Sequence, residues 1–343
     1  AALSLVDVRY EELPAVFDTS AALRADAPVI HDDPGSYKGA PARSVPEPNV
    51  QSYMLWEHGE LDPAFAKADR VFEHTFTTPL VPHGCMEANA CTVWVHPDGD
   101  IEVWSSNKVP YSVRDMLVKQ VGAPAGRVKV HVMAVGGDFG AKAALLDVPI
   151  CYLIADRTRR PVKLVHTYAE ELMVGPRRHP ATITLRTGVT NDGRITAAKT
   201  EMYYEAGAYP GSAVGAGAQC MLSPYDIENV LIDGYSVLDN KPKSAAYRAP
   251  GSPAASFAAE SVVDEICEKL SIDPLEFRIM NGAKEGTRRA TGLVNPRIGC
   301  IETVEAAKSH EHYSTPLEGP YRGRGVASGF WINGAGPACA TAN

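Results

Sequence analysis

The chain has 343 residues, of which 45% are hydrophobic and 22% are charged, and its formal net charge is −8. This composition is typical of a globular protein with a sizeable core, and the length suggests about two domains of ~150 residues each. The acidic balance and the lack of a lysine- or arginine-rich stripe argue against a nucleic-acid-binding surface. No apolar run reaches the roughly 18 residues that a membrane-spanning helix needs, so no such helix is predicted.

The cysteines and the first residues of the chain bear on the cellular compartment in which the protein is expected. The seven cysteines show no paired C-x-x-C spacing and so predict free thiols rather than a metal framework: Cys85, Cys91, Cys151, Cys220, Cys267, Cys300 and Cys339. Free thiols favour a reducing compartment, and we therefore expect the cytoplasm. The first residues carry no charged segment of the kind that begins a signal peptide, and none is expected.

The N-terminal part reads as the end of one domain followed by a linker. Residues 4–10 alternate between apolar and polar types, which predicts a strand, and a short helix is expected around residues 20–23. The stretch 33–48 is rich in proline and glycine and predicts extended linking chain. A domain boundary is therefore expected near residue 50.

The next part predicts a β-α-β-α run. Its expected elements are a strand at 70–78, a hairpin of 91–95 with 101–104, a helix from the N-cap Ser112 to Gly122, a strand at 128–134 and a helix at 144–157. The last helix is apolar on most sides, which predicts that it is largely buried, and Pro149 should kink it or sit in its first turn.

The rest of the chain predicts a strand, a second hairpin and a long helix. These are expected at 161–165, at 182–189 with 194–204, and at 253–270. Residues 206–219 are rich in glycine and alanine and read as a long loop or a loosely packed helix. A second domain boundary is expected between residues 285 and 321.

A glycine-rich turn joins the strand at 128–134 to the helix that follows it. Its sequence, Val135–Lys142, contains three glycines, which can adopt positive φ and present consecutive backbone N–H groups. With a helix N-terminus just behind, such a turn could bind an anion, plausibly a phosphate. The spacing matches neither a Rossmann turn nor a P-loop, and a purely geometric turn is the alternative.

A second loop of similar character precedes the long helix. It spans residues 245–253, contains Gly251 and two prolines, and carries Arg248. Two such loops could clamp one anionic ligand, although an ordinary helix entry with a surface arginine fits the sequence equally well.

His83 and Glu87 lie four residues apart and are the nearest approach to a metal-ligand pattern. The glycine between them and the strand that follows argue against one helical face, so zinc ligation is weakly supported. A partly buried His/Glu pair that orders its loop is the favoured interpretation.

Four segments in order along the chain carry a family resemblance. They are Trp104–Asn107, Gly136–Lys142, Ala246–Gly251 and Asp273–Arg278, the last followed by Asn281. Together they resemble the molybdopterin-binding large subunit of the molybdenum hydroxylases, the xanthine oxidase and aldehyde oxidoreductase family, in partial or split form.

The resemblance implies a fold and a division into domains. The expected fold class is α+β, a mixed-sheet, multidomain molybdopterin-binding subunit with the end of an α/β hammerhead domain at its N-terminus. Residues 1–49 would be the C-terminal part of that hammerhead-like domain with its linker, 50–300 the first molybdopterin-binding domain, and 301–343 the truncated start of the second.

The resemblance also implies a cofactor and its contacts. The contacts would be Gly136, Gly137, Phe139, Gly140, Tyr247, Arg248 and Ala249. The implied cofactor is molybdenum-molybdopterin dinucleotide, in the cytosine form, and the implied reaction is hydroxylation with oxygen from water. Electrons would leave through iron-sulfur clusters and FAD on partner subunits. No metal ligand is expected in this chain.

Departures from the family pattern narrow the substrate. Val81, Lys108, Ala143 and Pro250 stand where purine-oxidising members carry other residues, which argues against a purine, and Ala249 argues against carbon monoxide. An aldehyde or an N-heteroaromatic compound is expected instead. The family's glutamate base is not in this chain, so the catalytic residue is unknown and a second molybdopterin-binding chain is a possible source. The alternative is a non-catalytic scaffold that binds partner subunits.

Overall fold

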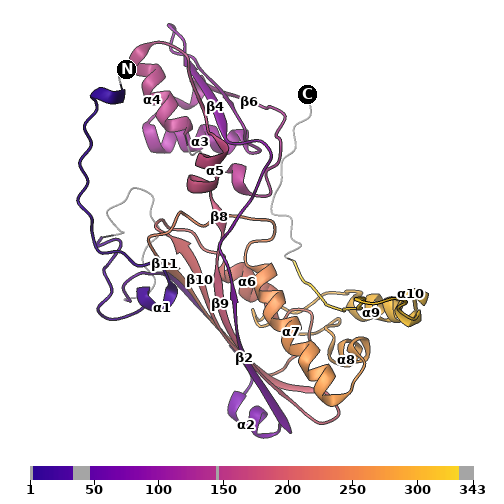
Figure 1. Cartoon of the computed structure of the whole chain (residues 1–343). Helices are drawn as coiled ribbons and strands as arrows, with labels where there is room; N and C mark the ends of the chain where they lie inside the picture. Colours follow the sequence, from indigo (N-terminus) through magenta and orange to yellow (C-terminus); the bar gives the residue numbers. More distant parts are fainter. Residues whose placement is uncertain (1–2, 34–46, 144–146, 332–343) are drawn as a thin grey trace.

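A computed structural model describes residues 3–33, 47–143 and 147–331 of the chain. The described residues form a mixed α+β fold with two lobes, each built on its own sheet (Figure 1). This confirms the expected fold class.

The larger lobe contains a five-stranded sheet in the order β1-β11-β10-β9-β2. Its strands are β1 (Val50–His58), β2 (Arg70–Thr78), β9 (Ala181–Val189), β10 (Ile195–Gly207) and β11 (Val230–Leu238). The β10–β11 pair is parallel and the other pairs are antiparallel, so the sheet is mixed.

Helices cover one face of this sheet and build the main core. Helix α7 (Ser252–Leu270) packs along β9 and β2 and against α6 (Val214–Met221) (Figure 1). Its apolar side chains recur at helical spacing, and Val262 and Ile266 are buried. Helix α8 (Pro274–Asn281) follows, and α9 (Cys300–Ser309) and α10 (Glu311–Ser314) project from the lobe.

The smaller lobe contains a four-stranded sheet in the order β6-β5-β4-β7. Its strands are β4 (Ala90–Val95), β5 (Ile101–Ser105), β6 (Val128–His131) and β7 (Val162–Val165). Strands β5 and β6 are parallel because α3 (Pro110–Val121) crosses between them, as a β-α-β unit requires. Helix α4 (Val148–Thr158) completes a separate core around Val93, Val103 and Leu117.

Two short strands join the lobes at their junction. The chain enters the smaller lobe through β3 (Val81–Pro82) and leaves it through α5 (Tyr168–Val174) and β8 (Arg177–Arg178). Strands β3 and β8 pair with each other, so both passages of the chain are tied together (Figure 1).

Most expected elements are present, but the N-terminal strand is wrong. Residues 4–10 carry only the short 3-10 helix Leu3–Leu5, and their side chains are exposed. Alternation predicts a strand only where a neighbouring strand can pair, and none lies beside this segment within the described residues. The short helix is present as α1 (Thr19–Ala22), capped by Asp18. Strand β1, strand β11 and helix α2 (Leu61–Ala66) were not predicted. Most of the expected linker, 34–46, lies outside the described residues.

Two helix starts also differ from the prediction. Helix α3 begins at Pro110 after Val109 rather than at an N-cap Ser112, because proline is favoured in the first turn. Helix α4 begins at Val148, and Pro149 sits in its first turn; residues 144–146 lie outside the described residues.

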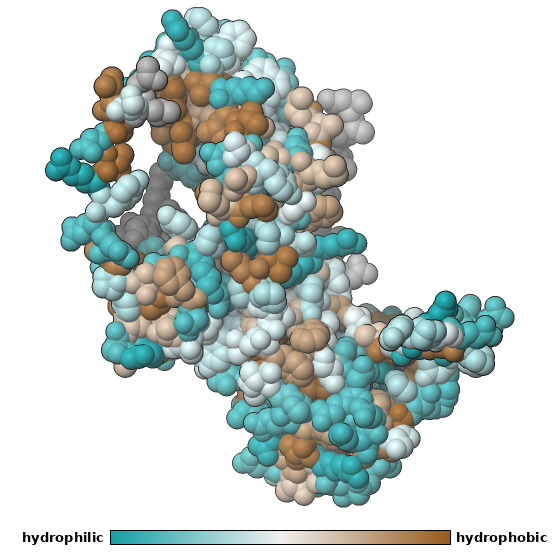
Figure 2. Space-filling model, in the orientation of Figure 1, coloured by the Kyte–Doolittle hydropathy of each residue, from teal (hydrophilic) through white to brown (hydrophobic). Residues whose placement is uncertain are grey.

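Helix α4 is less buried than expected. Ile150, Leu153 and Ile154 are about half exposed, at 52%, 53% and 45%. Figure 2 shows apolar side chains gathered on this lobe.

None of the described helices is both long and apolar enough to cross a membrane.

Candidate functional site

The glycine loop, Val135–Lys142, follows β6 and is anchored near its start, at Gly136, by Glu87. The Glu87 carboxylate accepts hydrogen bonds from the Gly136 N–H at 2.7 Å, from the Lys142 ammonium at 2.5 Å and from the Ser106 hydroxyl at 3.1 Å. The Glu87 N–H in turn donates to the Gly136 carbonyl at 3.1 Å. Lys142 is fully buried and forms an ion pair with Glu87, so one carboxylate binds both Gly136 and Lys142, at the two ends of the loop.

Asp138 anchors the other half of the loop. Its carboxylate accepts from the N–H groups of Gly140 at 2.8 Å and Lys142 at 2.7 Å, and it pairs with the Lys108 ammonium at 2.6 Å. Burial acts to raise the pKa of Asp138, but Lys108 and the two N–H groups outweigh it and hold this pKa below its ordinary value. Glu87 has a lowered pKa for the same reason, because Lys142, the Gly136 N–H and Ser106 outweigh burial.

Three consecutive N–H groups remain between these anchors. No described residue accepts a hydrogen bond from the backbone N–H of Gly137, Asp138 or Phe139. Successive N–H groups in a turn form a concave site for an anion. The glycine-rich sequence predicted consecutive exposed N–H groups here, and in the structure they lie between the Glu87 and Asp138 anchors.

The helix expected behind the loop does not contribute as predicted. The segment Ala141–Ala143 is a 3-10 turn, and α4 starts only at Val148 with Asp147 as its N-cap. The Asp147 carboxylate pairs with His166 at 2.8 Å. Any affinity for an anion therefore rests on the loop's own N–H groups and not on a helix dipole.

The second loop meets the glycine loop directly. The Arg248 N–H donates to the Phe139 carbonyl at 2.7 Å. A Cβ at Gly140 would lie only 2.2 Å from the Ala246 carbonyl oxygen, so glycine at 140 permits this close approach. Two loops that are more than one hundred residues apart in the sequence thus form one surface.

Stacked rings hold the second loop in place. The Tyr247 ring stacks on His83 with ring centroids 4.2 Å apart, and the Arg178 guanidinium carbon lies 4.2 Å from the Tyr247 centroid. The two ring nitrogens of His83 lie 2.9 Å from the Pro176 carbonyl oxygen and 2.8 Å from that of Ala246. The sequence suggested that His83 and Glu87 form a pair. In the structure they do not, because His83 supports the Arg248 loop and Glu87 supports the glycine loop.

Both loops carry backbone strain where they meet. Phe139 and Ala249 have φ values of 51° and 62°, a region that residues with a Cβ rarely occupy. Such conformations persist only where the surroundings enforce them, and they concentrate at functional sites. Phe139 is 48% exposed and Arg248 is also exposed, so both side chains are open to solvent.

The structure thus brings the segment from Gly136 to Gly140 and the segment from Tyr247 to Ala249 together. Sequence reasoning missed the roles of Glu87, Asp138, Lys142 and Arg178 in holding them. Lys142 and Asp138 lie inside the glycine motif, so charged residues between its glycines were an available signal. Nothing local pairs Glu87 with a lysine 55 positions away.

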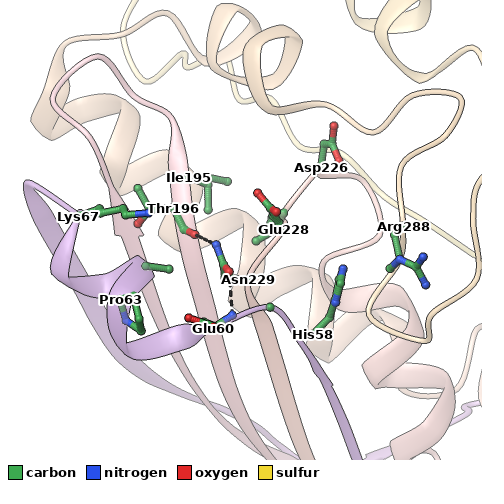
Figure 3. A pocket seen from close by; sticks show the side chains of 13 residues that line it. His58, Glu60, Pro63, Lys67, Ile195, Thr196, Asp226, Glu228, Asn229 and Arg288 are labelled. Atoms are coloured by element: carbon green, nitrogen blue, oxygen red, sulfur yellow. Dashed lines mark hydrogen bonds between the residues drawn. The ribbon is translucent and has the colours of Figure 1, made fainter.

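A second hollow lies away from these loops and has a different character. It is a cavity of about 800 Å³ beside α2 and the start of β10, lined by both acidic and basic side chains (Figure 3). Asn229 bridges its wall by bonding the Glu60 N–H and the Thr196 carbonyl, which is a structural role. None of the expected site residues lines this cavity. Within the described residues no cluster of three or more metal-binding side chains occurs.

Comparison with known proteins identifies the class of protein. Residues 44–282 match a family model described as "Molybdopterin cofactor-binding domain". The nicotinate dehydrogenase large molybdopterin subunit of Eubacterium barkeri is 33% identical over 90% of this chain and 70% of its own length. A probable xanthine dehydrogenase subunit of Bacillus subtilis is 28% identical over 98% of this chain and 44% of its own length. The chain belongs to the molybdopterin-binding large-subunit family of the molybdenum hydroxylases.

A solved structure agrees with this assignment. The aldehyde oxidoreductase from Desulfovibrio gigas superposes with a TM-score of 0.78 at 26% identity, covering 87% of this chain and 32% of that one. The chain therefore corresponds to about a third of that enzyme's length and to under half of the Bacillus subtilis relative.

Proposed function

We propose that this chain is the molybdopterin-binding part of a molybdenum hydroxylase that oxidises an aldehyde or an N-heteroaromatic substrate with water as the oxygen source. One observation carries the proposal. The glycine loop and the Arg248 loop, separated in sequence, meet around three consecutive N–H groups with no described acceptor. Family membership supplies the ligand whose anionic and polar atoms such groups would bind.

The residues present fit that cofactor. Gly136, Gly137, Phe139 and Gly140 would hold it from one side, and Tyr247, Arg248 and Ala249 from the other. When bound, it supplies two-electron oxidation of the substrate carbon. The chain's own residues orient it: Glu87 and Asp138 occupy the N–H groups at the ends of the glycine loop and leave the central three directed to a ligand. Arg248, whose backbone N–H donates to the Phe139 carbonyl, would add a positive charge to the same surface.

The names of the relatives support the substrate class and the partners. Nicotinate dehydrogenase names an N-heteroaromatic substrate, and aldehyde oxidoreductase from Megalodesulfovibrio gigas, 30% identical over 85% of this chain, names an aldehyde. We infer that the cofactor is the cytosine dinucleotide form. An iron-sulfur subunit and an FAD subunit would carry the electrons onward, and a second molybdopterin-binding chain would join the assembly. The assembly would work in the cytoplasm, with domains divided near residues 50 and 300.

A glycine substitution tests the cofactor role without touching the core. Gly137 has φ 101° and a Cβ there would meet only ordinary contacts at 3.4 Å, so Gly137→Val changes the loop backbone and little else. Molybdenum and pterin content of the isolated assembly should fall at least tenfold while its far-UV circular dichroism is unchanged. Gly122→Val is the matched control, because Gly122 also has positive φ but ends α3 in open space.

The outcomes separate two functions. Full molybdenum in the Gly137→Val assembly would contradict the assigned loop role. An unaltered assembly that contains partner subunits but no molybdenum would instead establish the non-catalytic scaffold.

A further inference from the structure

Two cysteines lie side by side in the core of the smaller lobe. The Sγ atoms of Cys91 and Cys151 are 3.4 Å apart, and the two residues are buried, at 5% and 1% exposure. A disulfide holds its sulfurs about 2.05 Å apart, so an approach of about 1.3 Å would join this pair. The sequence predicted free thiols, and in the structure two of these thiols are in contact.

The regular patterns of a strand and a helix place both residues there. Along β4 every second residue faces the core, and Cys91, Val93 and Val95 are the buried set. Along α4, Cys151 and Ala155 lie four residues apart and therefore share one buried face. Because α4 packs on β4, the two cysteines meet inside one core. Two regular elements, and not a loop, set their contact.

The contact makes the two thiols chemically unequal. The Cys91 thiol donates a hydrogen bond to the Cys151 sulfur, which lowers the pKa of Cys151 although burial acts to raise it. The same hydrogen bond, together with burial, raises the pKa of Cys91. The thiolate is the reactive form in thiol oxidation, so Cys151 is the sulfur that reacts first and Cys91 is the one that closes the bond.

Cys267 in α7 shows what burial does without such a contact. It is 3% exposed, and no described cysteine sulfur lies within hydrogen-bonding distance of its own sulfur. Burial raises the pKa of Cys267 to about 11. Cys267 is therefore a comparably buried thiol that has no partner for a disulfide among the described residues.

Helix α4 covers the sulfur pair and is itself open to solvent on its outer side. Ile150, Leu153 and Ile154 on this helix are about half exposed. A helix that is packed on one side only opens locally more readily than one buried all round, and such opening exposes buried groups to small reagents. Hydrogen peroxide is small enough to use an opening of this kind.

We propose that Cys91 and Cys151 are a redox modification site, a thiol pair that a peroxide converts to a disulfide and that small thiols reopen. The Cys151 sulfur attacks one oxygen of hydrogen peroxide, the O–O bond breaks, and a sulfenic acid and one water form. The Cys91 sulfur then attacks the sulfenic sulfur, the S–O bond breaks, and a second water leaves with the Cys91 proton. The two thiols together lose two electrons and two protons, and the peroxide is reduced to two waters. Two small thiols reverse the change by exchange and leave as their own disulfide.

The disulfide would close a covalent loop that contains the glycine loop. Cys91 and Cys151 are 60 positions apart, and the segment between them carries β5, α3, β6 and Val135–Lys142. A cross-link of this length restricts the unfolded chain and ties α4 to the sheet, so it should stabilise the smaller lobe. The modification goes beyond the proposed function and does not depend on it, because the two sulfurs meet in the core and not at the cofactor loops.

Peroxide treatment of the intact assembly tests the pair. After the peroxide is removed and the protein is quenched in acid, thiols are alkylated in denaturant without reductant and the chain is digested. We expect two peptides joined through Cys91 and Cys151, lighter by two hydrogen atoms than the two free-thiol peptides together, which a thiol reductant separates again. The thermal midpoint of the linked form should rise by at least about 5 °C and return on reduction.

Variants show which thiols are required. Cys151→Ala should abolish both the link and the rise in the thermal midpoint. Cys267→Ala is the matched control, because it removes a comparably buried thiol and should leave the link in place. The linked peptide is measured in the wild-type chain, so the test stands even where Cys151→Ala fails to fold.

Two results would overturn the proposal. One is that Cys91 and Cys151 are both alkylated as free thiols after the treatment. The other is that either of them is found only as a sulfinic acid, since no disulfide then protects it. Molybdenum content, measured in parallel, reports the proposed function separately, because the link can form in an assembly without molybdenum.

Discussion

The glycine loop and the Arg248 loop touch each other, yet they are held by different forces. Carboxylates hold the first: Glu87 and Asp138 accept from its N–H groups and pair with Lys142 and Lys108. Stacked groups hold the second, because the Tyr247 ring lies between His83 and Arg178. The first loop should therefore respond to changes of charge and pH, and the second to changes of ring size and shape.

This difference has a consequence for a shared ligand. Charged anchors set the positions of backbone N–H groups but leave the outer surface of the loop open, as the exposure of Phe139 shows. Stacking on His83 and Arg178 fixes the Tyr247 ring, and Arg178 also bonds the Arg248 carbonyl. The glycine loop thus offers hydrogen-bond donors to a ligand, and the Arg248 loop offers a rigid backbone next to them. Substitutions in each loop should separate the two contributions.

Glu87→Gln should have the largest effect on the glycine loop. It keeps the side-chain shape but leaves the buried Lys142 ammonium without a counter-charge, and removing one partner of a buried ion pair costs about 3–5 kcal/mol. Because the Glu87 side chain is 35% exposed, we expect about 3 kcal/mol, at the low end of that range. The free energy of unfolding in urea and the molybdenum content should both fall.

An exposed ion pair provides the control for that variant. Glu73 lies 3.5 Å from Arg186 with both side chains largely exposed, so Glu73→Gln should cost less than about 1 kcal/mol. Equal effects of Glu87→Gln and Glu73→Gln would show that the Lys142 pair does not hold the loop.

Tyr247→Leu should have a smaller effect, confined to the second loop. It removes the ring between His83 and Arg178, and losing a stacked pair and a cation–π contact is worth about 1–2 kcal/mol. Tyr247→Phe keeps the ring and should stay within about 0.5 kcal/mol of wild type in urea unfolding. If the phenylalanine variant loses as much as the leucine variant, the hydroxyl and not the stack supports the loop.

The sequence predicts the framework of this molecule better than it predicts the anchors of the site. The hairpin of β9 and β10 was predicted because the turn at 191–193 and the flanking alternation are local signals. Strand β11 was missed because no hairpin turn marks it. It pairs in parallel with β10 and antiparallel with β1, and no short turn joins it to either strand. Residues 4–10 show the opposite error, an alternating pattern with no strand beside it in the described part of the chain.

For the site, the motifs located both loops, but their mutual contact is a tertiary fact. The Arg248 N–H reaches the Phe139 carbonyl only because β3 and β8 bring the two lobes together. The same holds for Glu87 and Lys142, whose pairing depends on how the glycine loop folds back on the segment before β4. Helix α4 was placed too early, since a regular apolar pattern does not reveal where a loop ends before a proline.

Lys108→Met should have the smallest effect, and its pH dependence tests whether charge holds the glycine loop. Lys108 is 45% exposed, so Lys108→Met should cost under about 1 kcal/mol at pH 7 and low salt. Asp138 has a lowered pKa in the fold, so its stabilisation is complete above its ordinary value of 3.8 and is lost as the pH falls through the lowered pKa. The difference between wild type and Lys108→Met should therefore be constant from pH 7 down to about 4 and vanish in stronger acid. It should also shrink as salt is added, because the pair is partly solvated. Thermal unfolding from about pH 2 to 7 measures this, and a difference that persists at about pH 2 would show that Lys108 acts through packing and not through the charge of Asp138.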